Sequence, residues 1–493
     1  MGPVLFFLIA AVVLSAWLAG HDGGRRRSDD ARWARRRDLG PLLVRTPTAG
    51  RLTVGVSCHR LVAAESRHSL LVVGPTQSHK TTGLAIPALL EWRGPVLAAS
   101  VKGDLLAHTV AWRRRHGTVW VYDPTATTVP DTARWSPLSA VTSWAAARRV
   151  ADELVQATRS SATAPLADGD FWYATAAKLL APLLLAAAGS GRTMADVMRW
   201  VEEHETDEVA RALDAAGQAE ALRALWATAG RDDRQRSAVY TTAETVVEVF
   251  ADPAVAAATV SGPGAPGRPG RPGTPDAVGA VDPRRLLEGD HTLYLCAPAH
   301  EQRRLRPLFA GLVARVIEAA YDRAAAAGRP LDPPLLVVLD EAANVAPLAD
   351  LDTLASTAAG HGIQLVTVWQ DMAQITARYG PRAGTVVNNH RAKLFLSGIA
   401  DPDTLDHASA LIGETALPQR STTVDRGRSG AHSTTTTPVF RRLAPADALR
   451  RMPPGTGVLV CGHLPPVRLA LRPWYADRVL RARAQEDPDP TAP

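Results

Sequence analysis

The chain of 493 residues has a formal net charge of +6, and 46% of its residues are hydrophobic. This length exceeds what a single hydrophobic core usually serves, so two or three domains are expected. The cysteines Cys58, Cys296 and Cys461 are few, odd in number and far apart, which argues against a disulfide framework and against a zinc site. The mildly basic charge is compatible with a polyanionic partner but does not require one.

The N-terminal segment has the composition of a membrane anchor. Residues 2–20 are uncharged and almost wholly apolar, and seven arginines follow between Arg25 and Arg37. A helix of that length spans roughly 28 Å, about one hydrocarbon core, and positive charge stays on the cytoplasmic side. We therefore predict a single-pass anchor in the inner or plasma membrane at residues 1–21, a basic tether at 22–45 and a cytoplasmic body. The alternative, a cleaved signal peptide, lacks a basic start and has Trp17 where a small residue is needed.

The rest of the chain begins and ends with an α/β pattern. After a short β region at residues 46–70, short apolar runs alternate with helical patterns, which is typical of a parallel sheet covered by helices. Strands are predicted at residues 70–73, 94–100, 118–123, 292–297, 335–339, 363–368, 393–396 and 457–461. The two parts of this α/β domain are expected at residues 46–142 and 281–475.

Three other segments have a different composition. Residues 143–255 repeat apolar side chains at helical spacing without a strand pattern, so we predict an all-α insertion with a long apolar helix at 171–188. Residues 256–280 are rich in proline and glycine and are expected to form a surface loop. Residues 420–438 predict a Ser/Thr-rich loop or an exposed hairpin. The charged, Pro-rich residues 476–493 predict a flexible tail.

A phosphate-binding loop is the most informative motif. The apolar run 70–73 ends at Gly74, and Lys80-Thr81 begin the next helix, which fits G-x-x-x-x-G-K-[ST] at every fixed position except His79. Loop N–H groups and the helix N-terminus can surround the phosphates of ATP, while Lys80 reaches the β- and γ-phosphates and Thr81 holds Mg²⁺. Only four lysines accompany fifty-one arginines, so a lysine here is hard to ascribe to chance. The expected nucleotide-binding residues are Gly74, Pro75, Thr76, Gln77, Ser78, His79, Lys80, Thr81 and Thr82.

His79 is the departure from the motif. It carries a Cβ where glycine normally permits a close approach to phosphate, but histidine is one of the few side chains enriched at positive φ. We expect the loop to close, with nucleotide binding weakened by about 1–3 kcal/mol if the backbone is strained.

The second half of the predicted ATP site is an apolar strand that ends in two carboxylates. Asp340 is expected to hold Mg²⁺ and Glu341 to orient or deprotonate the attacking water. Both follow the carboxyl end of a strand, where ligands of parallel sheets bind. The central expectation is that Lys80 and this acidic pair converge on one magnesium–triphosphate.

Three further residues are weaker candidates. Gln370 ends the next predicted strand, where its amide either senses the γ-phosphate and positions the water or is simply a polar residue at a strand end. The arginines include many candidates for a finger that acts across a subunit boundary. Arg378 and Arg391 are plausible, and spacing does not choose between them.

With these motifs, the chain resembles the type IV secretion coupling proteins, the TraG/TraD-like conjugative DNA-transfer ATPases, over roughly residues 70–465. The resemblance rests on the phosphate loop, on Leu-Asp-Glu-Ala-Ala-Asn at 339–344, on Trp-Gln-Asp-Met-Ala-Gln at 369–374 and on residues 393–405. It implies a RecA-like P-loop NTPase domain, an all-α domain and a membrane anchor. It also implies a homo-hexamer that uses ATP to move single-stranded DNA, usually with a relaxase attached, or protein substrates toward a secretion channel. The family's usual anchor has two spans, whereas one is found here.

Two other functions stay open from the sequence. His79 leaves room for a docking scaffold that has lost nucleotide turnover, although Lys80, Thr81, Asp340 and Glu341 are retained. A related ring motor that moves double-stranded DNA is the other alternative.

Overall fold

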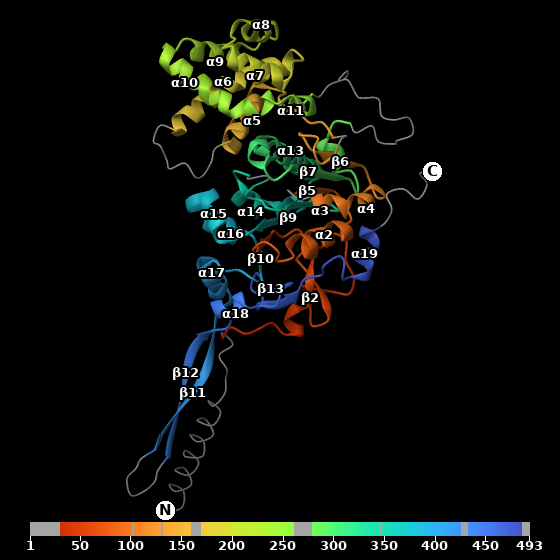
Figure 1. Cartoon of the computed structure of the whole chain (residues 1–493), viewed down its shortest axis with the longest axis vertical. Coiled ribbons are helices and arrows are strands. Elements are labelled where there is room, and N and C mark those ends of the chain that lie inside the picture. Colours follow the sequence, from red (N-terminus) through yellow and green to blue (C-terminus); the bar gives the residue numbers. More distant parts are fainter. Residues whose placement is uncertain are drawn as a thin grey trace, which may run out of the picture.

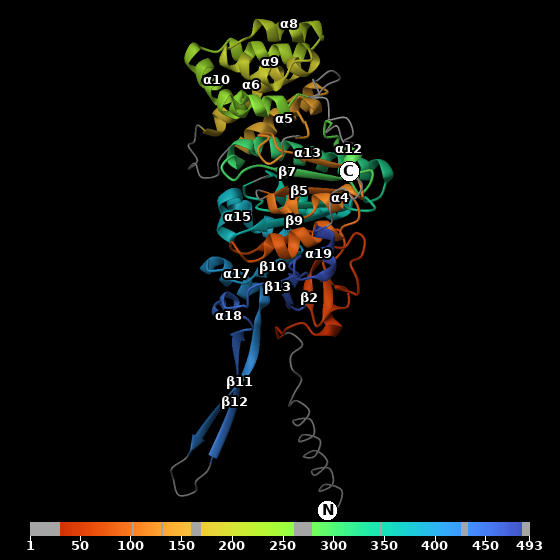
Figure 2. The same ribbon diagram turned by 45° about the vertical axis from the view of Figure 1, so that its right-hand side comes forward.

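The computed structural model describes residues 30–100, 103–129, 132–158, 169–260, 279–344, 348–424 and 432–485. The predicted anchor at 1–21 and most of the segment 256–280 lie outside these residues. The molecule is elongated, with a helical region at one end of its long axis, a 12-stranded sheet in the middle and a two-stranded hairpin projecting from the other end (Figure 1; Figure 2).

The main block of the sheet is parallel. Its strands lie in the order β10 (Ala392–Leu396), β4 (Leu70–Val73), β9 (Ile363–Trp369), β8 (Leu335–Leu339), β5 (Val96–Ser100), β7 (Thr292–Cys296) and β6 (Val119–Tyr122). Such strands are buried on both faces, which explains their uninterrupted apolar sequences. The predicted mixed α/β fold with a parallel sheet is confirmed.

Antiparallel strands extend this block beyond β10. They are β13 (Thr456–Cys461), β14 (Val467–Ala470), β2 (Thr53–Ser57), β3 (Arg60–Ala63) and β1 (Leu43–Val44). The predicted β region at 46–70 corresponds to β2 and β3.

Side chains of the parallel strands alternate between two hydrophobic cores. Leu71 and Val73 belong to the core shared with α13 (Gln302–Ala327), α14 (Leu351–His361) and α16 (Ala383–Asn389). Leu70 and Val72 face the opposite core, which includes side chains of α2 (Ile86–Glu91), α4 (Val110–Arg114) and α19 (Arg478–Ala484). The sheet is therefore covered on both faces, and polar groups gather at its edges.

The helical region comprises α5 (Trp144–Thr158), α6 (Gly169–Gly189), α7 (Met194–Glu202), α8 (Asp207–Ala215), α9 (Ala219–Ala229), α10 (Asp233–Val247) and α11 (Pro253–Ala258). Helix α6 continues through Pro182 and is long and apolar enough to cross a membrane, but 67% of its apolar window is buried inside the protein. It therefore fits the core helix of this region. Helix α13 contacts α5 and lies between the helical region and the sheet (Figure 1).

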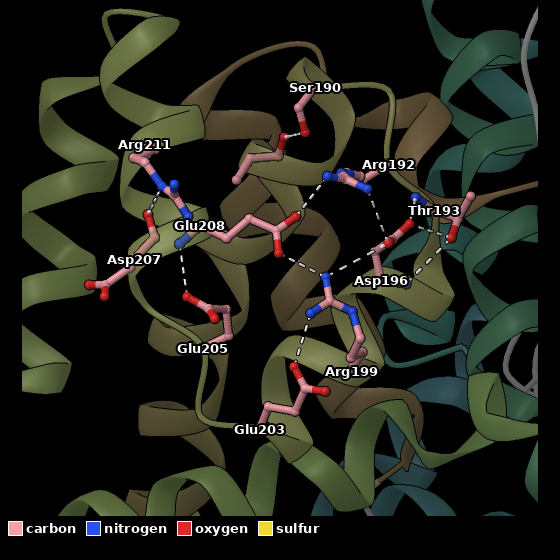
Figure 3. A network of polar contacts seen from close by, with 11 residues as sticks. Ser190, Arg192, Thr193, Asp196, Arg199, Glu203, Glu205, Asp207, Glu208 and Arg211 are labelled. Atoms are coloured by element: carbon pink, nitrogen blue, oxygen red, sulfur yellow. Dashed lines mark hydrogen bonds and ion pairs between the residues drawn. The ribbon is translucent and has the colours of Figure 1, made fainter.

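An ion-pair network ties together the first helices after α6 (Figure 3). Arg199 on α7 pairs with Glu203 at 2.9 Å and with Glu208 on α8 at 2.8 Å, and Arg192 reaches Glu208 at 2.9 Å. Thr193 and Asp196 cap the start of α7 reciprocally. The network links α7 to α8, and exposed pairs of this kind contribute little individually to stability.

The segments predicted as a basic tether and a flexible tail are partly packed against the body. Part of the predicted tether at 22–45 forms the short helix η1 (Arg36–Leu39) and strand β1, with Leu39 and Leu42 fully buried. Part of the predicted tail at 476–493 forms α19, in which Leu480 is buried and Arg483 donates to the carbonyl oxygen of Leu90 at 2.9 Å. The flexible-tail prediction was wrong for residues 478–484, where a buried leucine stands among arginines.

The projecting hairpin consists of β11 (Glu414–Val424) and β12 (His432–Arg442). The sequence left a Ser/Thr-rich loop or an exposed hairpin open for residues 420–438, and the structure has hairpin strands at both ends of this segment. Pro418 lies opposite Pro438, and proline blunts a free strand edge because it offers no N–H. The hairpin follows α17 (Pro402–Ile412), and the N–H of Ala31 donates to Glu414 O at its base at 2.9 Å.

Candidate nucleotide-binding site

The predicted phosphate loop joins β4 to a π-helical turn, η2 (Thr81–Ala85), which runs into α2. Gly74 is required by packing, since a Cβ there would lie 2.7 Å from Ser78 Oγ and 2.9 Å from Leu396 Cβ. Ser78 is buried and donates to Pro75 O at 2.8 Å. Lys80 Nζ donates to the carbonyl oxygens of Gly74 and Pro75, each at 2.6 Å, which closes the loop on itself.

His79 adopts the left-handed conformation that its position suggested, with φ at 63°. Its Nδ1 lies 3.2 Å from Thr82 Oγ1. A Cβ at Gly455 would lie 3.8 Å from His79 Cδ2, an ordinary contact distance, so the ring is not crowded there. The loop therefore closes with histidine in place of the second glycine.

Thr81 and Asp340 join the two halves of the predicted site directly. Thr81 Oγ1 donates to Asp340 Oδ2 at 2.8 Å, although the two residues are 259 positions apart, and Ser100 Oγ donates to the same oxygen at 3.3 Å. Burial raises the pKa of Asp340, the hydrogen bond from Thr81 lowers it, and the charges of Glu341 and Lys80 act on it in opposite directions. These oxygen atoms are the ligand type that Mg²⁺ prefers, so the residues fit a Mg²⁺ ion.

Glu341 follows Asp340 at the carboxyl end of β8 and has the left-handed φ of 68°. Its Oε2 accepts a hydrogen bond from Asn344 Nδ2 at 3.4 Å. Arg306 on α13 donates from Nε to Asn344 O at 3.2 Å and from Nη2 to Ala343 O at 3.3 Å. The turn at Glu341–Asn344 is therefore restrained by Arg306 on α13, the helix that precedes β8 in the chain.

Gln370 lies beside both halves of the site because β9 runs between β4 and β8. The carbonyl oxygen of the preceding Trp369 accepts a hydrogen bond from the N–H of Gly74 at 3.0 Å. The backbone N–H of Gln370 donates to Gln374 Oε1 at 3.0 Å. Gln370 is half-buried and lies at the end of β9 that is next to the phosphate loop.

The two candidate arginines lie at opposite edges of the sheet. Arg378 is on α15 (Met372–Tyr379), which follows the carboxyl end of β9, the same edge as the phosphate loop. Arg391 precedes β10 at the amino edge and forms an ion pair with Glu65. The structure thus brings Arg378, and not Arg391, to the edge of the sheet that carries the phosphate loop of the same chain.

Sequence patterns gave no role to Ser100, Arg306 or Asn344. Ser100 ends an ordinary apolar strand and meets Asp340 only because β5 lies next to β8. Arg306 is one of fifty-one arginines. Asn344 belongs to the motif at 339–344. Its position three residues after Glu341 was the only sequence feature that could have indicated a contact between the two.

Two family models match the chain. One is described as type IV secretory system conjugative DNA transfer and matches residues 37–262, and the other is described as TraM recognition site of TraD and TraG and matches residues 334–454. Together they match well over half of the chain.

Curated relatives match over most of the chain. The conjugal transfer protein TraG of Escherichia coli is 26% identical over 431 residues, which cover 78% of this chain and 62% of that protein. Protein VirD4 of Agrobacterium fabrum is 26% identical over 443 residues, which cover 85% of this chain and 60% of that protein. The chain therefore spans about three fifths of the length of these relatives.

Solved structures show where the fold recurs. The bacterial conjugative coupling protein TrwB, in its unbound form, superimposes with a TM-score of 0.66 at 18% identity and covers 94% of this chain and 97% of its own. TrwB in complex with ADP and Mg²⁺ has a TM-score of 0.64 at 19% identity and covers 92% of this chain and 97% of its own. At such identity these structures show the fold alone. Taken together with the family models and the sequence relatives, they place the chain in the family of the type IV secretion coupling proteins.

Proposed function

We propose that this chain is a membrane-anchored ATPase that couples ATP hydrolysis to the transfer of single-stranded DNA, with a bound relaxase, or of protein substrates to a type IV secretion channel. The observation that carries the proposal is the hydrogen bond from Thr81 to Asp340, because it brings the phosphate loop and the acidic strand to one place. Solved complexes of TrwB with an ATP analogue and with ADP and Mg²⁺ support the choice of nucleotide and metal.

Each residue of the site then has a defined task. Lys80 exchanges the carbonyl oxygens of Gly74 and Pro75 for the β- and γ-phosphates. Thr81 and Asp340 hold Mg²⁺, which neutralises the charge that develops on the phosphates. Glu341 orients the attacking water and accepts its proton. Gln370, at the strand end between the two motifs, positions that water or senses the γ-phosphate.

We further infer a division of labour along the chain. Residues 46–142 and 281–475 form the RecA-like nucleotide-binding domain, and residues 143–255 form the all-α domain. Residues 1–21 anchor the chain in the inner membrane. The chain assembles as a homo-hexamer, in which Arg378 is a candidate to contact the nucleotide of a neighbouring subunit. These assignments follow from the family and from the sequence patterns.

The test is ATP hydrolysis by the full chain in lipid nanodiscs, with and without circular single-stranded DNA. We expect DNA to stimulate hydrolysis, and Lys80→Ala to abolish it. Lys178→Ala is the matched control, because Lys178 is exposed on α6 in the helical region, and its basal hydrolysis should equal that of the wild type.

The alternatives predict different results from the same assay. A chain that binds ATP but never hydrolyses it with DNA present is the docking scaffold. A chain that double-stranded DNA stimulates more strongly than single-stranded DNA is the related duplex motor. Either outcome overturns the proposed function.

A further inference from the structure

The backbone at Glu341 is unusual for a glutamate. Its φ of 68° lies in the left-handed region, which non-glycine residues adopt only where the surrounding structure holds them. The turn is held within itself by the N–H of Asn344, which donates to Glu341 O at 2.9 Å. The carboxylate is held at one oxygen by Asn344 Nδ2 at 3.4 Å. One carboxylate oxygen is therefore restrained on the residue proposed to activate water.

Asn344 is itself restrained from the opposite side. Arg306 Nη2 lies 3.5 Å from Asn344 Oδ1, and its Nε and Nη2 also donate to the carbonyl oxygens of Asn344 and Ala343. An asparagine amide has one oxygen and one NH₂ group. Because the oxygen faces the guanidinium, the NH₂ group faces the carboxylate of Glu341.

Arg306 is half-buried, and its guanidinium is directed at the turn that carries Glu341 and Asn344. Burial lowers its pKa, and the positive charges of Arg378 and Arg303 lower it further. In the part of the chain that the structure describes, Arg306 forms no ion pair with a carboxylate, and its acceptors are oxygen atoms of Ala343 and Asn344. All three acceptors lie within residues 343–344, so the guanidinium restrains the turn that follows Glu341.

We propose that Asn344 and Arg306 are positioning residues for Glu341: Arg306 orients the amide of Asn344, and the amide fixes one carboxylate oxygen so that the other faces the attacking water. This inference rests on the proposed function. It concerns the hydrolytic step alone, because neither residue belongs to the phosphate loop or to the Mg²⁺ ligands.

Asn344→Asp provides the sharpest test. Aspartate keeps the size of the side chain and an oxygen for Arg306, but it replaces the N–H that faces Glu341 by a carboxylate oxygen, which repels the Glu341 carboxylate. We expect kcat for ATP hydrolysis by the full chain to fall by about 10- to 100-fold, the rate equivalent of one hydrogen bond to a charged group. KM for ATP and the affinity for ADP should stay within about twofold, because uniform binding is untouched.

Two arginine variants complete the design. Arg306→Lys keeps the charge but loses the planar fork that reaches three oxygens, so we expect a smaller fall in kcat with the same unchanged KM. Arg303→Ala is the matched control, since Arg303 is exposed on the same turn of α13, and its kcat should equal that of the wild type. Thermal unfolding of every variant checks that the chain still folds.

The outcomes separate this inference from the proposed function. A wild-type chain that binds ATP without hydrolysing it overturns both. A wild-type chain that hydrolyses ATP while Asn344→Asp and Arg306→Lys match Arg303→Ala overturns the positioning role alone. A rise in KM at unchanged kcat, or a loss of rate that only mirrors a loss of folded protein, also overturns it, because either would mean a binding or structural role.

Discussion

The two edges of the parallel sheet differ in how their polar side chains are paired. At the carboxyl edge, polar side chains from different strands bond to one another. At the amino edge, polar side chains bond to backbone carbonyl oxygens or form ion pairs. At the carboxyl edge Thr81 and Ser100 meet on Asp340, and His79 and Glu341 both have left-handed backbones. At the amino edge, Arg113 is 1% exposed and donates to the carbonyl oxygens of Trp92 and Gly94. His390 and the pair Arg391–Glu65 lie at that edge too.

The difference teaches which polar residues serve chemistry and which serve stability. Strained backbones and carboxylates without a full ion pair are expected at functional sites, and the carboxyl edge has both. At the amino edge the buried Arg113 has acceptors at 2.7, 2.8 and 2.9 Å, which is the usual condition for a buried polar group. Substitutions should therefore reduce turnover at one edge and stability at the other.

The largest expected effect is at the carboxyl edge. Glu341→Gln removes the proposed proton acceptor, so we expect ATP hydrolysis to fall by about 100-fold or more. Nucleotide affinity and the unfolding temperature should be retained, because glutamine keeps the shape of the side chain and the contact with Asn344. Glu65→Gln is the matched change at the amino edge, where it weakens the pair with Arg391. Glu65→Gln should lower the stability of the fold and leave the rate of ATP hydrolysis unchanged. If both variants lost the same fraction of the hydrolysis rate, the proposed difference between the two edges would be wrong.

Arg113 should show the largest effect at the amino edge. Arg113→Met leaves the carbonyl oxygens of Trp92 and Gly94 and the hydroxyl of Thr292 without their donor. We expect the free energy of unfolding to fall by about 3 kcal/mol or more, measured by urea titration, with an unchanged rate per folded molecule. Arg114→Met, at the exposed neighbouring position, should have little effect. If Arg113→Met lowered the rate of hydrolysis without lowering stability, Arg113 would serve chemistry and not stability.

The parallel block and the main motifs could be predicted from the sequence for a physical reason. Strands buried on both faces are uninterrupted apolar runs, and the phosphate loop and the acidic strand end are short contiguous patterns. Strand β14 was missed because its residues alternate between buried and exposed over only four positions. The packed residues of the tether and tail were missed because single buried leucines among arginines form no periodic pattern.

The rest of the site depends on strand order, which no local pattern contains. Gln370 lies between the two motifs because β9 runs between β4 and β8, and Ser100 reaches Asp340 because β5 lies on the other side of β8. Arg306 comes from a helix that follows the helical region in sequence and returns over the sheet. Such contacts join distant segments, so they appear only with the fold.

An intermediate effect is expected from pH at the amino edge. Burial lowers the pKa of His390 to about 4 from 6.5, and the nearby charge of Lys393 adds to this, while the hydrogen bond to Val386 opposes it. Between these pH values the unfolded chain binds a proton that the folded chain does not, so stability is lost as the pH falls from about 6.5 to about 4, by about 3 kcal/mol in total. Above pH 7 this contribution is constant.

The measurement is urea unfolding at several pH values, compared between the wild type and His390→Gln. The variant lacks the titrating ring, so its stability should fall less steeply between pH 7 and pH 5, whatever its absolute value at pH 7.5. His407 and His291, whose pKa values burial also lowers, contribute equally to both proteins. Parallel slopes for the two proteins would assign the pH dependence to groups other than His390.

The smallest expected effect is at His79. It tests whether the left-handed backbone of His79 is merely tolerated, in contrast to that of Glu341, which we propose is needed for hydrolysis. His79→Gly should change the affinity for ADP by less than about tenfold, or about 1.4 kcal/mol, because the ring has room beside Gly455 and lies within hydrogen-bond distance of Thr82. Gln77→Gly, at the other left-handed residue of the loop, with φ at 66°, is the matched control and should behave alike. If calorimetric titration shows a 100-fold higher affinity for ADP in His79→Gly but not in Gln77→Gly, histidine stores backbone strain in the phosphate loop. The carboxyl edge would then contain two strained residues that affect turnover, one at the binding step and one at the hydrolytic step.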